Sequence, residues 1–302
     1  MSGPDGLSVI HVPRRFVADE WGGTETTILE TCKQLEKQGH RSRIFTSTAL
    51  CDRKKDAIDG VEVRRFSYSY PFWGLSAEAR RDMDKKGGNL LSLSMLAALM
   101  RDKNIDLLHA HTGKRLGGII RTVSRLRKIP YVISLHGGVV DVPTAEMDQM
   151  LEPLKGTFEW GRAFGALLGA RRVLDDADAI ICVGKNERDA VREKYPGKRV
   201  EWLPNGVDSQ RFASGDGERF RQRFEIPADR RLVLSVSRID YQKNQLAQIE
   251  MLKRLLPSHP DLHLVLIGPV TVASYGQRLE EKIETEGLAA NVTLIPGLPG
   301  DD

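Results

Sequence analysis

Short apolar runs alternate with amphipathic stretches along most of this 302-residue sequence, and this alternation limits the fold more than any other feature. In the first two thirds, the apolar runs are residues 7–12, 43–46, 61–66, 106–110, 131–135, 179–183 and 200–203. Between them, apolar residues at helical spacing predict helices over 24–38, 89–101, 114–127, 159–174 and 185–194. Strands separated by such helices form a parallel sheet covered on both faces. The sequence therefore predicts an α/β protein with ligands beyond the carboxyl ends of its strands.

The alternation is interrupted between residues 205 and 229, where glycine, proline and Asn-Gly signals are typical of turns and linkers. It resumes with predicted strands at 232–237, 262–267 and 292–295 and predicted helices at 243–256 and 272–286. We therefore predict two domains, residues 1–212 and 213–302. Three strands are few for a domain of this kind, so we expect the second domain to be incomplete.

The composition, 40% apolar and 28% charged residues, is that of a globular protein. No apolar run is long enough to span a membrane, and the first residues lack the pattern of a signal peptide. Three scattered cysteines fit a reducing compartment. These features predict a cytoplasmic protein, and attraction to anionic headgroups would add peripheral contact with the inner membrane face. The net charge of +4 is mild, and we expect no nucleic-acid partner.

Two cations near the predicted strand at 232–237 indicate a phosphate site. Arg238 follows this strand, which we expect to be buried, and Lys243 comes five residues later, where a helix is predicted to begin. A guanidinium binds phosphate oxygens in pairs, an ammonium adds a point charge, and the helix dipole favours an anion at the same place. Arg238 and Lys243 are therefore the candidate residues for holding a phosphorylated ligand.

Other candidate residues follow strands of the first domain. Gly22 and Gly23 lie between the first strand and the first helix, where a ligand can approach the backbone closely, although a simple turn explains them equally well. The spacing G-x-G-x-x-G is absent, which argues against a standard dinucleotide site. His136 directly follows the fifth strand and is followed by two glycines, so it is a candidate for hydrogen bonding or proton transfer to a ligand.

Two further histidines, His109 and His111, end the fourth strand. We expect them to face opposite sides of the sheet, one toward a site and one toward the helices, so we predict no metal binding by this pair. No Cys/His spacing resembles a zinc site. Asn205 lies in the turn that closes the first domain, and this turn is either a hinge between domains or a tight surface turn.

Taken in order, these motifs resemble those of glycosyltransferase family 4. The matching pieces are Gly22-Gly23, Leu-Leu-His-Ala-His at 107–111, Ser-Leu-His-Gly-Gly at 134–138, Pro-Asn-Gly-Val-Asp at 204–208 and Ser-Arg-Ile-Asp-Tyr-Gln-Lys-Asn at 237–244. The resemblance implies a GT-B fold, in which two Rossmann-like domains with parallel sheets face a cleft.

The resemblance also implies roles for individual residues. Arg238 and Lys243 would grip the diphosphate of a nucleotide-sugar donor, and His136 would orient the transferred sugar. The substrate-binding residues would be Gly22, Gly23, His111 and Asn205. The family's pair of glutamates spaced E-x(7)-E would follow residue 300, so we expect poor or no activity from a chain that ends at Asp302.

The implied reaction moves a sugar from a nucleotide-diphosphate sugar to an acceptor hydroxyl with retention of configuration and without a metal ion or other cofactor. The acceptor would be a glycan, a lipid-linked molecule or a small molecule. Two alternatives stay open: a sugar-nucleotide epimerase of similar fold, and a non-catalytic fragment that binds nucleotide sugars.

Overall fold

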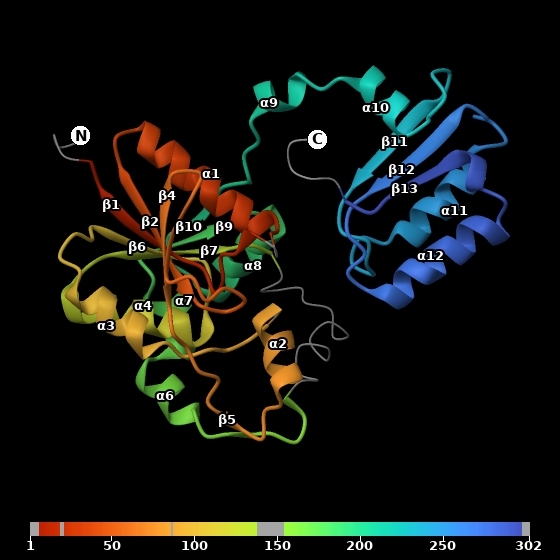
Figure 1. The fold of residues 1–302 in the computed structure, drawn as a ribbon. Coiled ribbons are helices and arrows are strands. Elements are labelled where there is room, and N and C mark those ends of the chain that lie inside the picture. The colour runs from red at the N-terminus through yellow and green to blue at the C-terminus, as the bar shows by residue number, and fades with distance from the viewer. Residues whose placement is uncertain (1–5, 19–20, 86, 138–153, 298–302) are drawn as a thin grey trace. The chain divides into compact units, whose positions relative to one another are not determined.

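The structure, a computed structural model, describes residues 6–18, 21–85, 87–137 and 154–297 (Figure 1). Its chain forms two compact units, Met1–Val207 and Asp208–Asp302. The interruption of the sequence pattern predicted a division after residue 212, five residues later. The intervening residues begin a short helix, α9 (Ser209–Ala213), which belongs to the second unit.

The first unit is built on a sheet whose described strands follow the order β10-β9-β7-β6-β1-β2-β4-β3. All neighbouring strands are parallel except β3 and β4, which form an antiparallel pair at one edge. This arrangement confirms the predicted α/β class. The strands are β1 (Ser8–Val12), β2 (Arg41–Ser47), β3 (Lys55–Ile58), β4 (Val61–Phe66), β6 (Leu107–Ala110), β7 (Tyr131–Leu135), β9 (Ala179–Cys182) and β10 (Val200–Trp202).

Helices cover both faces of this sheet, as the alternation predicts. Neighbouring residues Ile44 and Phe45 on β2 point to opposite faces and belong to different apolar clusters. The Ile44 cluster includes α1 (Gly23–Lys37), whereas the Phe45 cluster includes α3 (Leu93–Arg101) and α4 (Lys114–Arg127). The remaining α-helices in the described part of the unit are α2 (Ala77–Lys85), α6 (Arg162–Leu167), α7 (Val173–Asp176) and α8 (Lys185–Lys194).

The helix predicted over residues 159–174 is interrupted in the structure. It consists of α6, a 3-10 turn at Ala170–Arg172, and α7, which follows directly. Gly169 has a φ of +62°, and a Cβ at this position would lie 2.3 Å from Nη1 of Arg121. The left-handed backbone ends α6, because a right-handed helix cannot continue through it. Helix α2 and the small antiparallel pair β5 (Phe72–Trp73) and β8 (Phe158–Glu159) were not predicted.

The second unit has a parallel three-stranded sheet in the order β11-β12-β13 within its described residues. Its strands are β11 (Arg231–Val236), β12 (Leu262–Ile267) and β13 (Val292–Ile295). Along β12, Leu264 and Leu266 pack with α11 (Gln245–Leu255) and α12 (Ala273–Thr285), and Val265 and Ile267 pack on the side of α10 (Gly217–Arg223). A 3-10 turn, Ala289–Asn291, precedes β13.

The expectation of a buried strand before Arg238 is wrong for part of β11. Leu234 and Val236 are 57% and 69% exposed. Among the described residues, β11 pairs only with β12 and therefore forms an edge of the sheet. The strand delivers its following residues to the sheet's carboxyl edge without being enclosed on both faces.

Candidate functional site

Four histidines gather at the carboxyl edge of three neighbouring strands of the first unit. His11 lies on β1, His109 on β6, His111 just beyond β6, and His136 just beyond β7. Strands β7, β6 and β1 are adjacent in the sheet, so the carboxyl edge brings these side chains together. We call these four residues the histidine cluster.

The cluster is linked by short contacts between ring nitrogens. Nδ1 of His11 lies 3.2 Å from Nε2 of His111, and Nδ1 of His111 lies 2.9 Å from Nε2 of His136. The ring of His109 lies beside that of His111, with centroids 4.1 Å apart, and its Nε2 is 2.7 Å from Oγ of Ser134. The three hydrogen-bonded histidines form a chain from β1 to the residue after β7.

Burial keeps the histidine cluster uncharged near neutral pH. It lowers the pKa of His11 to about 4 and the pKa of His136 below its usual value. It also lowers the pKa values of His109 and His111 well below the usual value, and the neighbouring imidazoles add to the effect. A neutral imidazole has one N–H donor and one lone pair, so each ring can orient a partner without contributing a charge.

The expected divergence of His109 and His111 is wrong. Residues two apart along a strand point to the same face, and His111 continues the pattern of β6 by donating its backbone N–H to the carbonyl of Val12, 3.1 Å away. His11 was not identified from the sequence, although it pairs in register with His109. Its signal was a lone histidine within the apolar run Val9–Val12, which indicates a buried polar side chain if the strand is covered on both faces.

In the second unit, Arg238 and Lys243 lie on the turn that connects β11 to α11. The Arg238 side chain is 47% exposed; its Nη2 donates to Oε1 of Gln242 over 3.2 Å and lies 3.5 Å from Oδ2 of Asp240. Lys243 is also exposed. Helix α11 begins at Gln245, two residues later than predicted, because Asn244 adopts a left-handed conformation with φ of +51°.

Two buried side chains hold this turn. Asp240 accepts a hydrogen bond from the backbone N–H of Lys243 over 3.1 Å and a second one from the Thr271 hydroxyl over 3.3 Å. Gln245 donates from Nε2 to the carbonyl of Arg238 over 2.9 Å. The turn is therefore fixed to α11, while the two cationic side chains that it carries reach solvent.

The remaining candidates of the first unit occupy helix and loop ends. Gly22 precedes the first residue of α1, Gly23, and no side chain caps this helix, so the two glycines present a helix N-terminus with little steric cover. Asn205 is exposed in the segment after β10. His136 and His111 are brought together; Gly22, Gly23 and Asn205 make no hydrogen bond to them among the described contacts. Gly138, in the quoted motif, lies outside the described residues.

The fold and the sequence together define the class of this protein. The fold is of the GT-B type found in glycosyltransferases. The profile of Glycosyltransferase Family 4 matches residues 21–211, and the profile of Glycosyl transferases group 1 matches residues 216–302. The chain belongs to glycosyltransferase family 4, as the order of its motifs predicted.

Individual relatives agree with this assignment. The chain is 27% identical to a D-inositol 3-phosphate glycosyltransferase from a Nocardioides species over 90% of its own length and 58% of the relative's. It is 25% identical to the alpha-monoglucosyldiacylglycerol synthase of Streptococcus pneumoniae over 82% of its length and 52% of the relative's. The Anabaena protein HepE, solved in complex with UDP, superimposes with a TM-score of 0.64 at 14% identity, covering 98% of this chain and 70% of HepE.

The chain thus spans little more than half the length of these curated relatives. In the described residues, no helix is both long and apolar enough to cross a membrane.

Proposed function

We propose that this chain takes part in the transfer of a sugar from a nucleotide-diphosphate sugar to an acceptor hydroxyl, with retention of configuration. The observation that carries the proposal is the exposed Arg238 guanidinium on a fixed turn at the carboxyl edge of the second unit's sheet, in a chain of glycosyltransferase family 4. The complexes of HepE with UDP and with UDP-glucose support a uridine nucleotide as the first donor to test.

In the proposed reaction, the acceptor oxygen attacks the anomeric carbon while the bond from that carbon to the diphosphate oxygen breaks. The leaving phosphate gains negative charge, and it takes the proton from the acceptor hydroxyl on the same face of the sugar. Arg238 and Lys243 stabilise the developing charge, so the diphosphate needs no metal ion in this scheme. His136, held by His111 and neutral, orients a sugar hydroxyl by a hydrogen bond.

The test of the donor site is calorimetric titration of the chain with UDP, GDP and ADP in the presence of a chelator. We expect one of the three to bind and the Arg238→Ala variant to bind it about 10–100-fold more weakly, because charge-assisted hydrogen bonds contribute about 1.5–3 kcal/mol. The matched control is Arg231→Ala, at the opposite end of β11, where the guanidinium pairs with Asp261. Unchanged affinity in Arg238→Ala, or no binding of any nucleotide, would contradict this role for residues 208–302.

Incubation of the nucleotide sugar without acceptor separates the transferase from the epimerase alternative. An epimerase would return an isomerised sugar still attached to the nucleotide, whereas a transferase would leave the sugar unchanged until an acceptor is added. Binding without either reaction would favour the non-catalytic alternative.

The acceptor is proposed to be a glycan, a small polar molecule or a lipid-linked molecule, and exposed aromatic residues favour the last. Trp73 on β5 and Phe158 on β8 stack with ring centroids 5.6 Å apart, yet they are 66% and 62% exposed. Leu167, on α6, is 81% exposed. Aromatic side chains of this kind insert at the interface of a bilayer.

We therefore expect the chain to sediment with vesicles of phosphatidylcholine and phosphatidylglycerol. The double variant Trp73→Ala/Phe158→Ala should bind them at least about tenfold more weakly, since fully burying even one large apolar side chain contributes about 1.5–3 kcal/mol. Trp202→Ala is the control, because that exposed indole lies under the Lys185 ammonium rather than in the stacked pair. If the double variant sediments like the unchanged protein, the pair is not a membrane contact.

A further inference from the structure

We propose that His11, His109 and His111 form a binding site for a divalent transition-metal ion, with Zn²⁺ as the best match. One ring nitrogen from each of the three lies within 4.8 Å of the others. The inference concerns the first unit alone and does not depend on the transfer reaction. The metal site belongs to the first unit, whereas Arg238 and Lys243, the residues proposed to bind the diphosphate, belong to the second unit.

The backbone places these three rings on one face. Parallel pairing of β1 with β6 sets His11 opposite His109, and His111 follows two residues later on the same side. Nδ1 of His11 and Nε2 of His111 are 3.2 Å apart. Two nitrogens bound to one tetrahedral Zn²⁺ at about 2.0–2.1 Å lie about 3.3 Å from each other. The pair is therefore already spaced as two ligands of one ion.

Two of the three rings, His109 and His111, have a further polar contact that orients them as metal-bound histidines are oriented. The ring nitrogen that does not bind a metal usually hydrogen-bonds to another polar group, which fixes the tautomer. Nε2 of His109 has Oγ of Ser134 at 2.7 Å, which leaves Nδ1 as its ligand atom. Nδ1 of His111 has His136 at 2.9 Å, which leaves Nε2 facing His11. Each of the two rings thus has one nitrogen anchored outside the site, and an ion would replace the proton that the other nitrogen of His111 shares with His11.

The His11 ring carries an unsatisfied polar atom. It is fully buried, and its Nε2 has no hydrogen-bond partner among the described residues. Buried polar atoms without partners are rare in folded proteins. The two ring nitrogens exchange places when the imidazole rotates, so in either orientation His11 offers one nitrogen to an ion beside His111.

The donor set decides which ion fits. Imidazole nitrogens suit Zn²⁺, Co²⁺, Ni²⁺ and Cu²⁺, whereas Mg²⁺ and Ca²⁺ prefer oxygen ligands. Three protein ligands leave a fourth tetrahedral position for water or a polar group of a bound molecule. His111 is only partly buried, which gives the ion a route from solvent. An ion held there would also fix His111, and through it the position of His136.

The test uses the untagged chain, stripped of metal by a chelator and dialysed. Titration with Co²⁺ should produce the visible absorption of a tetrahedral complex at one ion per chain, and Zn²⁺ should displace it. Zn²⁺ should also raise the melting temperature, and Mg²⁺ should not. The variants His11→Gln and His109→Gln should lose stoichiometric binding, and Ser134→Ala should lower the affinity for Zn²⁺ about 10–100-fold.

The matched control is His263→Gln, which changes a buried histidine of the second unit. It should bind Zn²⁺ like the unchanged chain. Circular dichroism checks that each variant folds. If the glutamine variants do not fold, the affinity of Ser134→Ala for Zn²⁺ and the Co²⁺ spectrum of the unchanged chain decide whether the metal site exists. Failure of Co²⁺ to give a tetrahedral spectrum, or binding that is equal in all folded variants, would overturn the site. Neither result bears on nucleotide binding by Arg238.

Discussion

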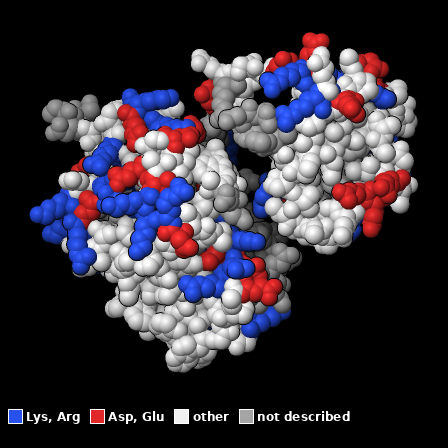
Figure 2. Space-filling view, in the orientation of Figure 1, with Lys and Arg blue, Asp and Glu red and all other residues white. Residues whose placement is uncertain are grey.

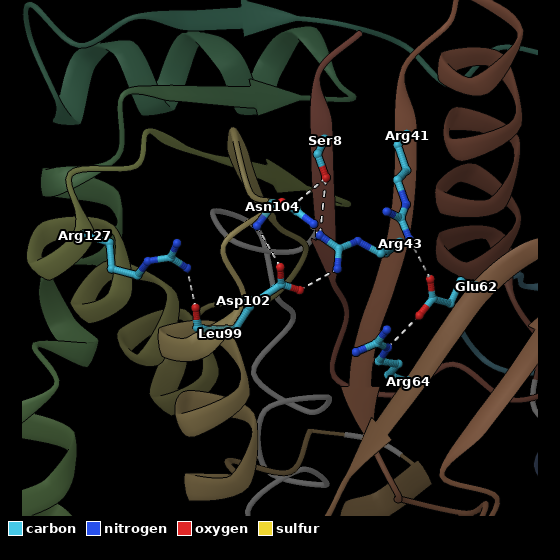
Figure 3. A network of polar contacts seen from close by, with 9 residues as sticks. All are labelled: Ser8, Arg41, Arg43, Glu62, Arg64, Leu99, Asp102, Asn104 and Arg127. Atoms are coloured by element: carbon cyan, nitrogen blue, oxygen red, sulfur yellow. Dashed lines mark hydrogen bonds and ion pairs between the residues drawn. The ribbon is translucent and has the colours of Figure 1, made fainter. Parts of the chain in front are cut away.

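Replacing Arg43 with methionine is expected to lower the free energy of unfolding by about 3–5 kcal/mol. The Arg43 side chain is 4% exposed and lies 2.5 Å from Oδ2 of Asp102, measured from Nη1 (Figure 3). Its Nη2 also donates to the carbonyl of Asn104 and approaches Oγ of Ser8. Methionine would fill a similar volume but would leave the Asp102 carboxylate and the Asn104 carbonyl without their buried donor.

A neighbouring ion pair supplies the control for this change. Arg41 lies two residues before Arg43 on β2 and pairs with Glu62 of β4. The side chains of Arg41 and Glu62 are 58% and 36% exposed (Figure 3). Such pairs contribute about 0.2–1 kcal/mol, so Arg41→Met should have a small effect. Figure 2 shows acidic and basic side chains side by side over this unit, as expected of screened surface pairs. Denaturant unfolding measures both variants.

The effect of Arg43→Met should depend on pH. Burial opposes the charge on Asp102, but the Arg43 guanidinium, the Asn104 backbone N–H and the nearby Arg64 charge together hold the pKa of this carboxyl below its usual value. The folded-state pKa is depressed, so the stabilisation is present above the unfolded-state pKa and is lost as the pH falls through the folded-state value. The difference in free energy of unfolding between the unchanged protein and Arg43→Met should therefore be largest near neutral pH and become smaller in acid. If Arg43→Met and Arg41→Met lowered the free energy of unfolding equally, the buried pair of Arg43 and Asp102 would not be the cause of the destabilisation.

The fold was predictable because its main determinants are local. A run such as Tyr131–Leu135 has the length and apolar character of a buried strand, and turn residues mark its ends. The interruption of the helix at 159–174 was missed because the left-handed backbone at Gly169, and the Arg121 guanidinium of a distant helix that lies where a Cβ would be, appear only in the folded chain. Helix α2 was missed because its sequence is polar, with only Met83 and Asp84 buried.

The candidate site shows the same division between local and distant causes. Arg238 and Lys243 could be found from the sequence because they follow one strand on one turn. Membership of His11 in the histidine cluster depends on which strands are neighbours, and the order β7-β6-β1 is not written in any single stretch of sequence. The shared face of His109 and His111, by contrast, follows from strand geometry alone, because residues two apart on a strand point to the same side.

Replacing Gly268 with alanine is expected to disturb the turn that carries Arg238. Gly268 follows β12 directly, with φ of +148°, and a Cβ there would lie 2.0 Å from the carbonyl oxygen of Ser237. The close approach is held by backbone bonds on both sides: Ser237 donates to Ile267 over 2.8 Å, and Ile239 donates to Pro269 over 2.9 Å. An alanine must push the two strand ends apart or break these bonds.

The free energy of unfolding of Gly268→Ala should fall by about 2–4 kcal/mol, because the added methyl group meets backbone and the φ value is unfavourable for any residue with a Cβ. The affinity for the nucleotide should fall in the variant that is still folded, since Arg238 follows Ser237 directly. Gly217→Ala is the control: this glycine begins α10 with no atom within 4 Å of the added Cβ, so stability should rise slightly or stay unchanged. Denaturant unfolding and calorimetry measure the two effects, and a Gly268→Ala protein as stable as Gly217→Ala would show that the strand ends separate at little cost.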